Sequence, residues 1–251
     1  MRVVITFGCE KPFSLKAGYN EIIQGFIYRH LPHETSTYVH DRGYGDGVRK
    51  FKFFTFSRIQ SDTLRYEKDR FTFGRKFSLV VSSMDSGFME QLLNGMEKDA
   101  ELSIQGFPLH ILRTDWYQHA PKGNELKIEM LSPMTLYSTL MTSSGSKKAY
   151  YYSPFEREFS EQVHSNLSRK YTAIHSKPWV GDACNMTALD VDVHRNHHVI
   201  IFKGGPVNAW DGSYTLSGPD ELLEIAYFSG LGSKNSQGFG CWTTAKEERM
   251  N

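Results

Sequence analysis

The chain has 251 residues, of which 39% are hydrophobic and 14% aromatic, and it carries a formal net charge of only +1. This length suits one large domain or two small ones, and the charge excludes a chain that is polybasic throughout, so a polyanionic partner would have to meet a local basic patch. The three cysteines (Cys9, Cys184 and Cys241) form no C-x-x-C pair, which argues against a zinc knuckle or a disulfide framework. No signal peptide opens the chain and no apolar run approaches the roughly 18 residues of a membrane span, so we expect a soluble, cytoplasmic protein.

The first half of the chain predicts six elements in the order β-α-β-β-α-β. Apolar residues at helical spacing indicate a helix at 20–31 with Asn20 as its N-cap, and Asp85 can cap a second helix that runs to about residue 98. Runs rich in aromatic and β-branched residues predict strands at 2–8, 49–57, 71–82 and 102–112, the last one interrupted at Gly106 and Pro108. This order of elements is the ferredoxin-like arrangement.

The second half repeats this order less clearly. Ser153 and Glu156 form a capping box with Pro154 at the first helical position, and apolar residues follow at intervals of four from Phe155 to Tyr171. A further helix opens at 219–221, and strands are predicted at 126–137, 188–193, 198–203, 214–216 and 242–245. We therefore expect an α+β fold of two tandem ferredoxin-like (RRM-like) domains, 1–118 and 119–251.

A glycine-rich loop at 230–240 follows the last predicted helix and precedes the closing strand. Phosphate-binding loops of nucleotide-binding proteins run from a strand into a helix N-terminus, so the order helix–loop–strand argues against that class. An anion held here would need a nest of backbone N–H groups together with Lys234. The alternative is a helix C-cap and a tight turn, which accounts for Gly230 but not for three further glycines.

The pattern of this loop, glycine–hydrophobic–glycine, five residues, glycine–hydrophobic–glycine, resembles the signature of the RAMP superfamily. The N-terminal half is similar to one of its members, the CRISPR-associated endoribonuclease that processes precursor repeat RNA. The similar segments are 24–28 (Gln-Gly-Phe-Ile-Tyr), 38–40 (Tyr-Val-His) and 52–57 (Lys-Phe-Phe-Thr-Phe-Ser). The resemblance implies cleavage within the repeats without a metal or cofactor, in which the 2′-hydroxyl attacks the adjacent phosphate. A 2′,3′-cyclic phosphate and a 5′-hydroxyl result, and guide RNAs are generated.

The resemblance matches Tyr28, His40 and Lys52 to the catalytic set of that family. Imidazole titrates near neutral pH, which makes His40 the candidate for proton transfer. Lys52 would stabilise the charge on the phosphate, with Lys50 on the same strand face as the fallback. Tyr28 would position the ribose or share the proton transfer.

Each of these residues also has a plain structural interpretation. A histidine in a loop is usually just solvated, and His30 and His33 lie nearby as rivals of His40. Tyr28 could be a core residue, and the two lysines could belong to an ordinary solvated strand face.

RNA contact is expected through local positive charge and through the glycine loop. Basic residues gather after the first helix, and two lysines lie in a Ser/Gly loop at 142–148. The candidates for RNA binding are Arg42, Arg49, Lys50, Lys147, Lys148, Lys203, Gly230, Gly232, Lys234, Gly238 and Gly240. Phosphate contacts and stacking of bases on aromatic side chains would hold the RNA.

No metal site is expected. Asp190, Asp192 and His194 alternate along a predicted strand and could face one ion, but a polar solvent face explains them as well. The His40-Asp41 doublet is also found in HD-type phosphohydrolases, but that class needs a helical bundle, which this strand-rich chain lacks.

The expected partner is CRISPR repeat RNA, as precursor and as mature guide, and neither DNA nor a membrane is expected. Membership of a CRISPR effector complex and formation of a homodimer stay open. Two other functions are compatible with the sequence: a non-catalytic RAMP-type RNA-binding subunit of an effector complex, which would leave the repeat intact, and a general RNA-recognition protein. The joint presence of Tyr28, His40 and Lys52 favours the nuclease.

Overall fold

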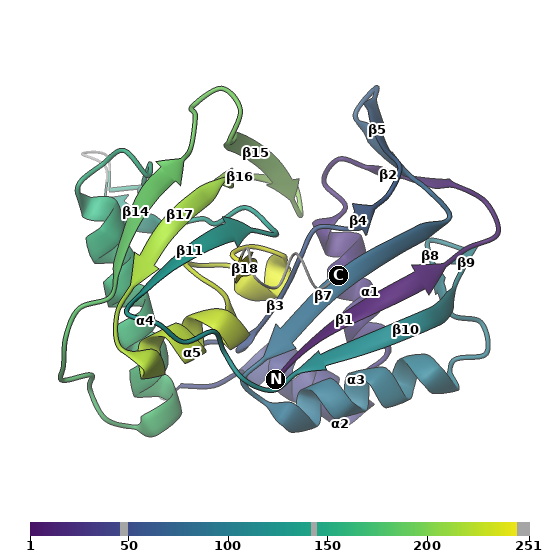
Figure 1. Ribbon diagram of the computed structural model, residues 1–251, viewed down its shortest axis with the longest axis horizontal. Coiled ribbons are helices and arrows are strands. Elements are labelled where there is room, and N and C mark those ends of the chain that lie inside the picture. Colours follow the sequence, from purple (N-terminus) through teal and green to yellow (C-terminus); the bar gives the residue numbers. More distant parts are fainter. Residues whose placement is uncertain (46–49, 142–144, 245–251) are drawn as a thin grey trace.

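An antiparallel sheet in the order β10-β1-β7-β3 organises the N-terminal half of the computed structural model, which describes residues 1–45, 50–141 and 145–244 (Figure 1). Its strands are β1 (Arg2–Gly8), β3 (Phe54–Phe56), β7 (Lys76–Ser83) and β10 (His110–Tyr117), and the short β4 (Gln60–Ser61) also pairs with β7. The helices α1 (Asn20–Arg29) and α3 (Ser86–Lys98) connect β1 to β3 and β7 to β10. The ferredoxin-like order predicted for this half is therefore confirmed.

The C-terminal half repeats the same topology with a sheet in the order β14-β17-β11-β18. Its strands are β11 (Glu125–Met130), β14 (Asn185–Asp190), β17 (Ser213–Ser217) and β18 (Trp242–Thr244), and its helices are α4 (Glu158–His175) and α5 (Asp220–Ser229). Two tandem ferredoxin-like halves are thus confirmed, while the domain boundary between residues 118 and 119 stays a prediction. None of the helices in the described parts of the chain has the length and apolar character that a membrane span requires.

Short elements decorate both halves, and most of them were not predicted. The N-terminal half adds a three-stranded sheet of β2 (Phe13–Lys16), β5 (Leu64–Glu67) and β6 (Arg70–Phe73) and the hairpin β8 (Ser103–Ile104) with β9 (Phe107–Pro108). The C-terminal half adds the hairpins β12 (Tyr137–Met141) with β13 (Lys147–Tyr151) and β15 (His197–Phe202) with β16 (Gly205–Trp210). The remaining turns are α2 (His33–Thr37), the π-helical η1 (Tyr38–Arg42) and the 3-10 turn η2 (Asn235–Gln237). In Figure 1 the strands β5 and β15, one from each half, stand at the same end of the molecule.

Strand β1 is buried along its whole length because both faces of its sheet are covered. Ile5 and Phe7 belong to the core that this sheet shares with α1 and α3. Val4, which points to the opposite face, packs with Val80 and Cys241 in a small cluster between the halves. A strand covered on both faces reads as a continuous apolar run, which is why residues 2–8 were predictable as a strand.

Arg2, at the start of β1, forms hydrogen bonds with the C-terminal half. Its guanidinium donates hydrogen bonds to the backbone oxygens of Trp242 and Tyr227 at 2.8 and 2.9 Å. The same group lies 3.5 Å from the centroid of the Tyr227 ring. Because hydrogen bonds from a charged, buried donor are stronger than neutral ones, this contact fixes the orientation of one half on the other.

The glycine loop packs directly on the N-terminal half. Gly230, Gly232, Gly238 and Gly240 are buried, with φ between 68° and 82°, a region that disfavours any residue with a Cβ. A Cβ on Gly238 would overlap the ring of Phe56, and one on Gly240 would overlap the backbone oxygen of Leu231. The pattern of glycines is therefore explained by close packing of the loop against β3 and against itself.

Side chains of α1 and β3 bind the carbonyl groups of this loop. Asn20 donates to the backbone oxygens of Gln237 and Gly238 at 2.9 and 3.1 Å, and Gln24 donates to that of Ser236 at 2.7 Å. The prediction of Asn20 as an N-cap is wrong, because α1 begins at Asn20 itself and Tyr19 occupies the N-cap position. The residue type fits both roles, since an amide can accept from a helix N-terminus or donate to a distant carbonyl.

Other predicted boundaries differ from the structure for local reasons. The strand expected at 49–57 is wrong at residues 50–53, because Phe53 has a φ of 51°, which no strand allows. Lys50 and Lys52 therefore do not share a strand face. The strand expected at 71–82 is divided into β6 and β7 around Gly74, and the one expected at 126–137 ends at Met130.

Of two predicted helix starts, the one at Asp85 is confirmed and the one at Ser153 is wrong. Asp85 is the N-cap of α3, where its carboxylate accepts from the backbone N–H of Phe88 at 3.1 Å. The Glu156 carboxylate does accept from the backbone N–H of Ser153 at 2.7 Å, but α4 begins only at Glu158. The capping box thus closes a turn before the helix instead of opening the helix.

A glycine substitution tests the packing of the loop. Gly240→Ala places a methyl group against Leu231 at a φ of 77°, whereas Gly106→Ala has nearly the same φ of 78° and meets no atom within 4 Å. Left-handed backbone alone costs about 1–2 kcal/mol, so we expect about that loss of unfolding free energy for Gly106→Ala and clearly more for Gly240→Ala. Urea unfolding of both variants measures the difference, and equal losses would contradict the packing role.

Candidate active site

Tyr28, His40 and Lys52, which the sequence singled out, lie together in the structure. They come from the end of α1, from η1 and from the segment that leads into β3. The rings of Tyr28 and His40 meet edge to face with their centroids 5.7 Å apart, and the Lys52 ammonium donates a hydrogen bond to the backbone oxygen of His40. Three separate segments therefore deliver a phenol, an imidazole and an ammonium group to one place.

Backbone pairing in the connector explains how Lys52 reaches His40. Tyr44 and Phe51 exchange backbone hydrogen bonds of 2.7 and 2.9 Å, which closes the connector as an antiparallel bridge. The chain enters this bridge through Gly43, whose φ of 61° and tight approach to Phe51 leave no room for a Cβ. His40 itself lies in a π-helical turn, a conformation that is frequent at functional sites.

The charges around His40 set which groups can move a proton. The imidazole Nδ1 lies 2.6 Å from the Asp41 carboxylate, and this hydrogen bond holds the pKa of Asp41 below its usual range. With Nδ1 engaged, Nε2 is the nitrogen left for a substrate. Burial, and secondarily the Asp41 carboxylate, raises the pKa of Tyr28 to about 12, so its phenol keeps its proton at neutral pH. Burial lowers the pKa of Lys52, and Asp41 acts in the opposite direction.

The rival histidines occupy different environments. His30 is buried, and its two ring nitrogens lie 2.7 Å from the backbone oxygen of Phe26 and 2.9 Å from the Asp99 carboxylate. It is therefore a satisfied core histidine. His33 is exposed at the start of α2.

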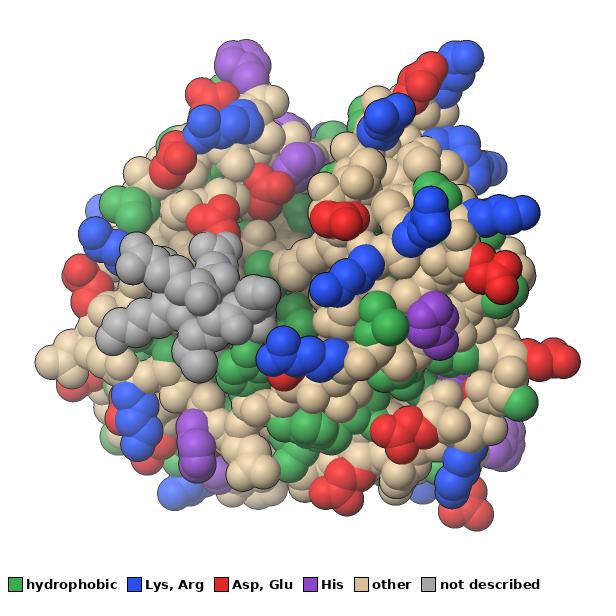
Figure 2. Space-filling view, turned by 45° about the vertical axis from the view of Figure 1, so that its right-hand side comes forward, with side chains coloured by type: hydrophobic (Ala, Val, Ile, Leu, Met, Phe, Trp, Pro, Cys, Tyr) green, Lys and Arg blue, Asp and Glu red, His purple; other side chains and the backbone are tan. Residues whose placement is uncertain are grey.

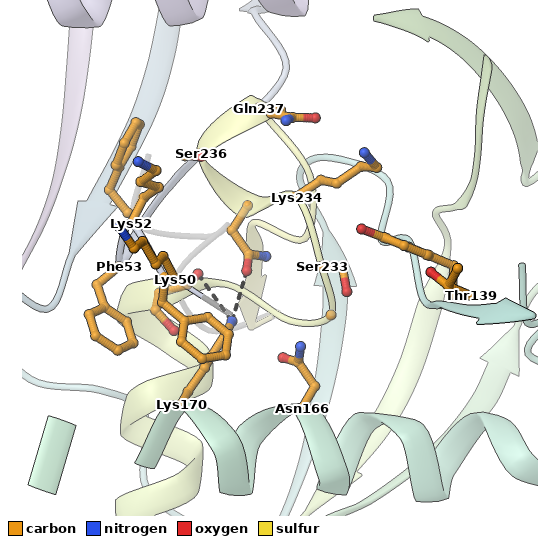
Figure 3. Close-up of a pocket in the computed structure, with 16 residues that line it drawn as sticks. Lys50, Lys52, Phe53, Thr139, Asn166, Lys170, Ser233, Lys234, Ser236 and Gln237 are labelled. Atoms are coloured by element: carbon orange, nitrogen blue, oxygen red, sulfur yellow. Dashed lines mark hydrogen bonds between the residues drawn. The ribbon is translucent and has the colours of Figure 1, made fainter. Parts of the chain in front are cut away.

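A cavity of about 370 Å³ lies between Lys52 of this cluster and the glycine loop (Figure 3). Lys50 and Lys52 lie on its left in this view, Ser233 and Lys234 lie on its right, Ser236 and Gln237 lie above, and α4 forms its floor. Lys170 and Lys234 also contribute to its lining, and none of its lining residues in the described ranges is acidic. A cavity lined by lysines and without a carboxylate attracts a polyanion.

A second, larger cleft of about 1070 Å³ is lined by Tyr28 and His40 on the N-terminal side and by β15 on the C-terminal side. Arg58, His198 and Lys203 belong to the same lining. Figure 2 shows the corresponding notch between the two halves, with basic, acidic and histidine side chains around its rim. The candidate site is thus accessible from a groove that could hold an extended chain.

Lys170 is a site residue that the sequence analysis missed. It is 1% exposed, and its ammonium donates to the backbone oxygen of Gly230 at 2.6 Å and to the Asn235 side-chain oxygen at 2.8 Å. It also reaches the backbone oxygen of Ser229 at 3.4 Å, so it caps the C-terminus of α5, where the dipole favours a cation. Burial lowers the pKa of Lys170 to about 7. The sequence does contain a signal that could have identified Lys170, namely a lysine within the apolar stripe of a predicted helix.

The predicted RNA-binding residues are spread over several surfaces. Arg42 is exposed beside His40 in η1, Lys147 and Lys148 are exposed on β13, and Lys203 is exposed at the turn between β15 and β16. Lys234 is half-buried, with its ammonium 5.4 Å from the centroid of the Tyr137 ring. Arg49 lies outside the described residues.

The glycine loop offers an anion less than the sequence suggested. Backbone N–H groups in the loop donate to backbone oxygens within the protein, which argues against the predicted nest; these are the N–H groups of Leu231, Ser233, Gln237, Gly238 and Gly240. RNA contact at the four buried glycines stays a prediction. The charged group that the loop presents is Lys234.

The expected strand face of Asp190, Asp192 and His194 is absent, because β14 ends at Asp190 and the other two residues lie in the turn that follows. Asp190 pairs with Arg195 at 2.5 Å, and Asp192 accepts from the backbone N–H of His194 at 2.9 Å. Within the described residues, no group of three His, Cys, Asp or Glu side chains is placed to hold a metal ion.

Comparison with known proteins places the chain among relatives of one kind. The family model "CRISPR-associated protein Cas6, N-terminal" matches residues 15–113, and "CRISPR associated protein Cas6, C-terminal" matches residues 117–244. The chain is 28% identical over 204 residues to "CRISPR-associated endoribonuclease Cas6 1" of Methanocaldococcus jannaschii, covering 80% of this chain and 77% of the relative. It is 27% identical over 241 residues to "CRISPR-associated endoribonuclease Cas6" of Pyrococcus furiosus, covering 92% and 84%.

A solved structure described as "An RAMP protein binding different RNA substrates" has the same fold. Its TM-score is 0.81 at 16% sequence identity, over 97% of this chain and 99% of the other.

The protonation of Lys170 can be tested through stability. Its pKa falls from 10.5 in the unfolded chain to about 7 in the fold, so between these values the unfolded state binds more protons and stability rises with pH. Relative to Lys170→Met, the wild-type free energy of unfolding should therefore rise by up to about 1.4 kcal/mol per pH unit above pH 7.

Urea unfolding at pH 6 to 9.5 measures this difference, with Lys177→Met as the control because Lys177 is an exposed lysine just beyond α4. A difference that stays constant over this range would show that Lys170 keeps its ordinary pKa.

Proposed function

The chain belongs to the Cas6 family of CRISPR-associated proteins, and on that premise we propose that it is an endoribonuclease that cuts CRISPR precursor RNA within its repeats. The observation that carries the proposal is the convergence of Tyr28, His40 and Lys52 beside a cavity lined by lysines. The curated relatives from M. jannaschii and P. furiosus are both named endoribonucleases, which supports the same activity here.

The proposed reaction is a transesterification that needs no metal. The ribose 2′-oxygen forms a bond to the adjacent phosphorus, the bond to the 5′-oxygen breaks, and a 2′,3′-cyclic phosphate remains. The proton of the 2′-hydroxyl goes to Nε2 of His40, the ring nitrogen left for substrate when Nδ1 is bound to Asp41. The Tyr28 phenol, which keeps its proton at neutral pH, donates towards the departing 5′-oxygen.

Lys52 is assigned to the negative charge that develops on the phosphate. Its ammonium is half-buried and held by the backbone oxygen of His40, so it does not have to be ordered during the reaction. A preorganised cation at a developing oxyanion is worth about 10²–10³ in rate. Lys50, which is exposed at the cavity, is assigned to RNA phosphates outside the reacting bond.

A second function is favoured by one observation. The solved structure with the TM-score of 0.81 is described as a RAMP protein that binds different RNA substrates, and a protein of this fold could hold repeat RNA without cutting it. In that case the chain would be a non-catalytic subunit of a CRISPR effector complex. Under either function the proposed partners are precursor and mature guide RNA in the cytoplasm, with a homodimer as a further proposal.

Replacement of His40 tests the proposed chemistry. Removal of a general base costs about 10²–10⁴ in rate, so His40→Ala should slow single-turnover cleavage of repeat RNA in EDTA at least a hundredfold. His33→Ala is the matched control, because His33 is an exposed histidine seven residues earlier. A loss below about tenfold for His40→Ala would remove His40 from the reaction.

Comparison of the two neighbouring lysines tests the assignment of the charge. Lys52→Ala should lower the single-turnover rate at saturating RNA by about 10²-fold. Lys50→Ala should act mainly on the affinity for RNA and should reduce the slope of log binding constant against log salt concentration by about 1. Its loss of cleavage rate should be at least tenfold smaller than that of Lys52→Ala. Equal rate losses, or a larger loss at Lys50→Ala, would reverse the assignment.

A further inference from the structure

The floor of the lysine-lined cavity carries a buried polar group without a partner. Asn166 lies on α4 one turn before Lys170, and the spacing of four residues places both side chains on one helix face. Asn166 is 5% exposed, and its Oδ1 has no hydrogen-bond partner among the described residues. Native proteins rarely leave a buried oxygen unbonded, so this atom calls for a ligand that supplies a donor.

The position of Asn166 makes a purely structural role unfavourable. Apart from Lys170, the buried stripe of α4 around it is apolar, with Val163 and Leu167 in the core of the C-terminal half. A leucine would fill this place without burying an unbonded amide oxygen. Retention of a destabilising polar residue is typical of a functional site.

The surroundings of Asn166 specify the kind of ligand. In Figure 3 the Asn166 amide and the Lys170 side chain point from α4 into the cavity, towards the loop that carries Lys234. Lys50 lies across the cavity from Lys234, and Tyr137 is part of the lining. Cations suit a phosphate, an aromatic face suits a base, and the cavity volume of about 370 Å³ falls in the range of about 300–1,000 Å³ typical of ligand sites.

We infer that this cavity is a subsite for one unpaired nucleotide of the RNA, and that Asn166 selects adenine there. On binding, the amide turns so that its buried Oδ1 accepts from the exocyclic N6 amino group and its Nδ2 donates to N7, the bidentate pairing by which asparagine reads adenine. Lys50 and Lys234 bind the phosphates of this nucleotide, and Lys52 links the subsite to the reacting phosphate. The inference rests on the proposed function, since it names a base that the same RNA would present.

The test measures base preference with defined probes. Fluorescence anisotropy of the full-length protein with labelled tetra-adenylate and tetra-uridylate, at one fixed salt concentration, should show at least fivefold tighter binding of tetra-adenylate. Asn166→Leu should bring the two affinities within about twofold of each other while leaving the melting temperature equal to or above that of the wild type. Asn94→Leu is the control, because Asn94 is an exposed asparagine on α3, and it should keep the preference.

A second measurement probes the same contact without a mutation. Tetra-adenylate built from 7-deazaadenosine lacks the N7 acceptor, and it should bind the wild type several-fold more weakly than tetra-adenylate but bind Asn166→Leu equally. An unchanged adenine preference in Asn166→Leu, or no effect of 7-deazaadenosine on the wild type, would overturn the subsite. Cleavage of repeat RNA by the same preparations reports on the proposed function separately. A protein that cuts the repeat but shows no adenine preference contradicts the subsite alone, and one that does not cut contradicts the nuclease.

Discussion

The carbonyl groups of the glycine loop are bound from both halves of the protein, and the candidate site depends on this contact. Asn20 and Gln24 donate to the loop from α1, and Lys170 donates from α4. The loop can lie so close to β3 only because its glycines have no Cβ. As a result, one wall of the lysine-lined cavity comes from each half, and the separation of the halves cannot change without breaking buried hydrogen bonds.

This rigid frame gives the catalytic cluster and the cavity different tasks. The cluster is assembled within the N-terminal half, by the bridge between Tyr44 and Phe51 that brings Lys52 to His40. The cavity is assembled between the halves. A nucleotide held in the cavity would therefore be positioned against the cluster by the tertiary structure, so that binding energy from one half serves the chemistry of the other.

Element order was predictable from the sequence because apolar periodicity survives in every main helix and strand. The long-range contacts could not be predicted from the sequence. Asn20 has the residue type of a helix cap, and nothing local shows that its partner lies more than 200 residues away. Phe53 reads as a strand residue, yet it adopts a left-handed backbone, which displaces Lys50 and Lys52 from the expected strand. The hairpin of β15 and β16 was missed because only its first strand has a strong apolar pattern.

The candidate site was predictable to different degrees. Tyr28, His40 and Lys52 followed from the resemblance to a family, while the residues alone left each of them a plain structural interpretation. Asn166 and Lys170 were hidden because they lie in the apolar stripe of α4, where intervals of four draw attention to the hydrophobic residues. A polar residue inside such a stripe is a usable signal, since burial without a function is unfavourable.

The central claim is that the cluster around His40 cuts RNA by promoting attack of the RNA's own 2′-hydroxyl on the adjacent phosphate. The most direct test is to incubate the purified protein with its repeat RNA in EDTA and to determine the chemical ends of the products. The account predicts a single cut that leaves a 2′,3′-cyclic phosphate and a 5′-hydroxyl. Cleavage only when a divalent ion is added, or products with a 3′-hydroxyl and a 5′-phosphate, would contradict it.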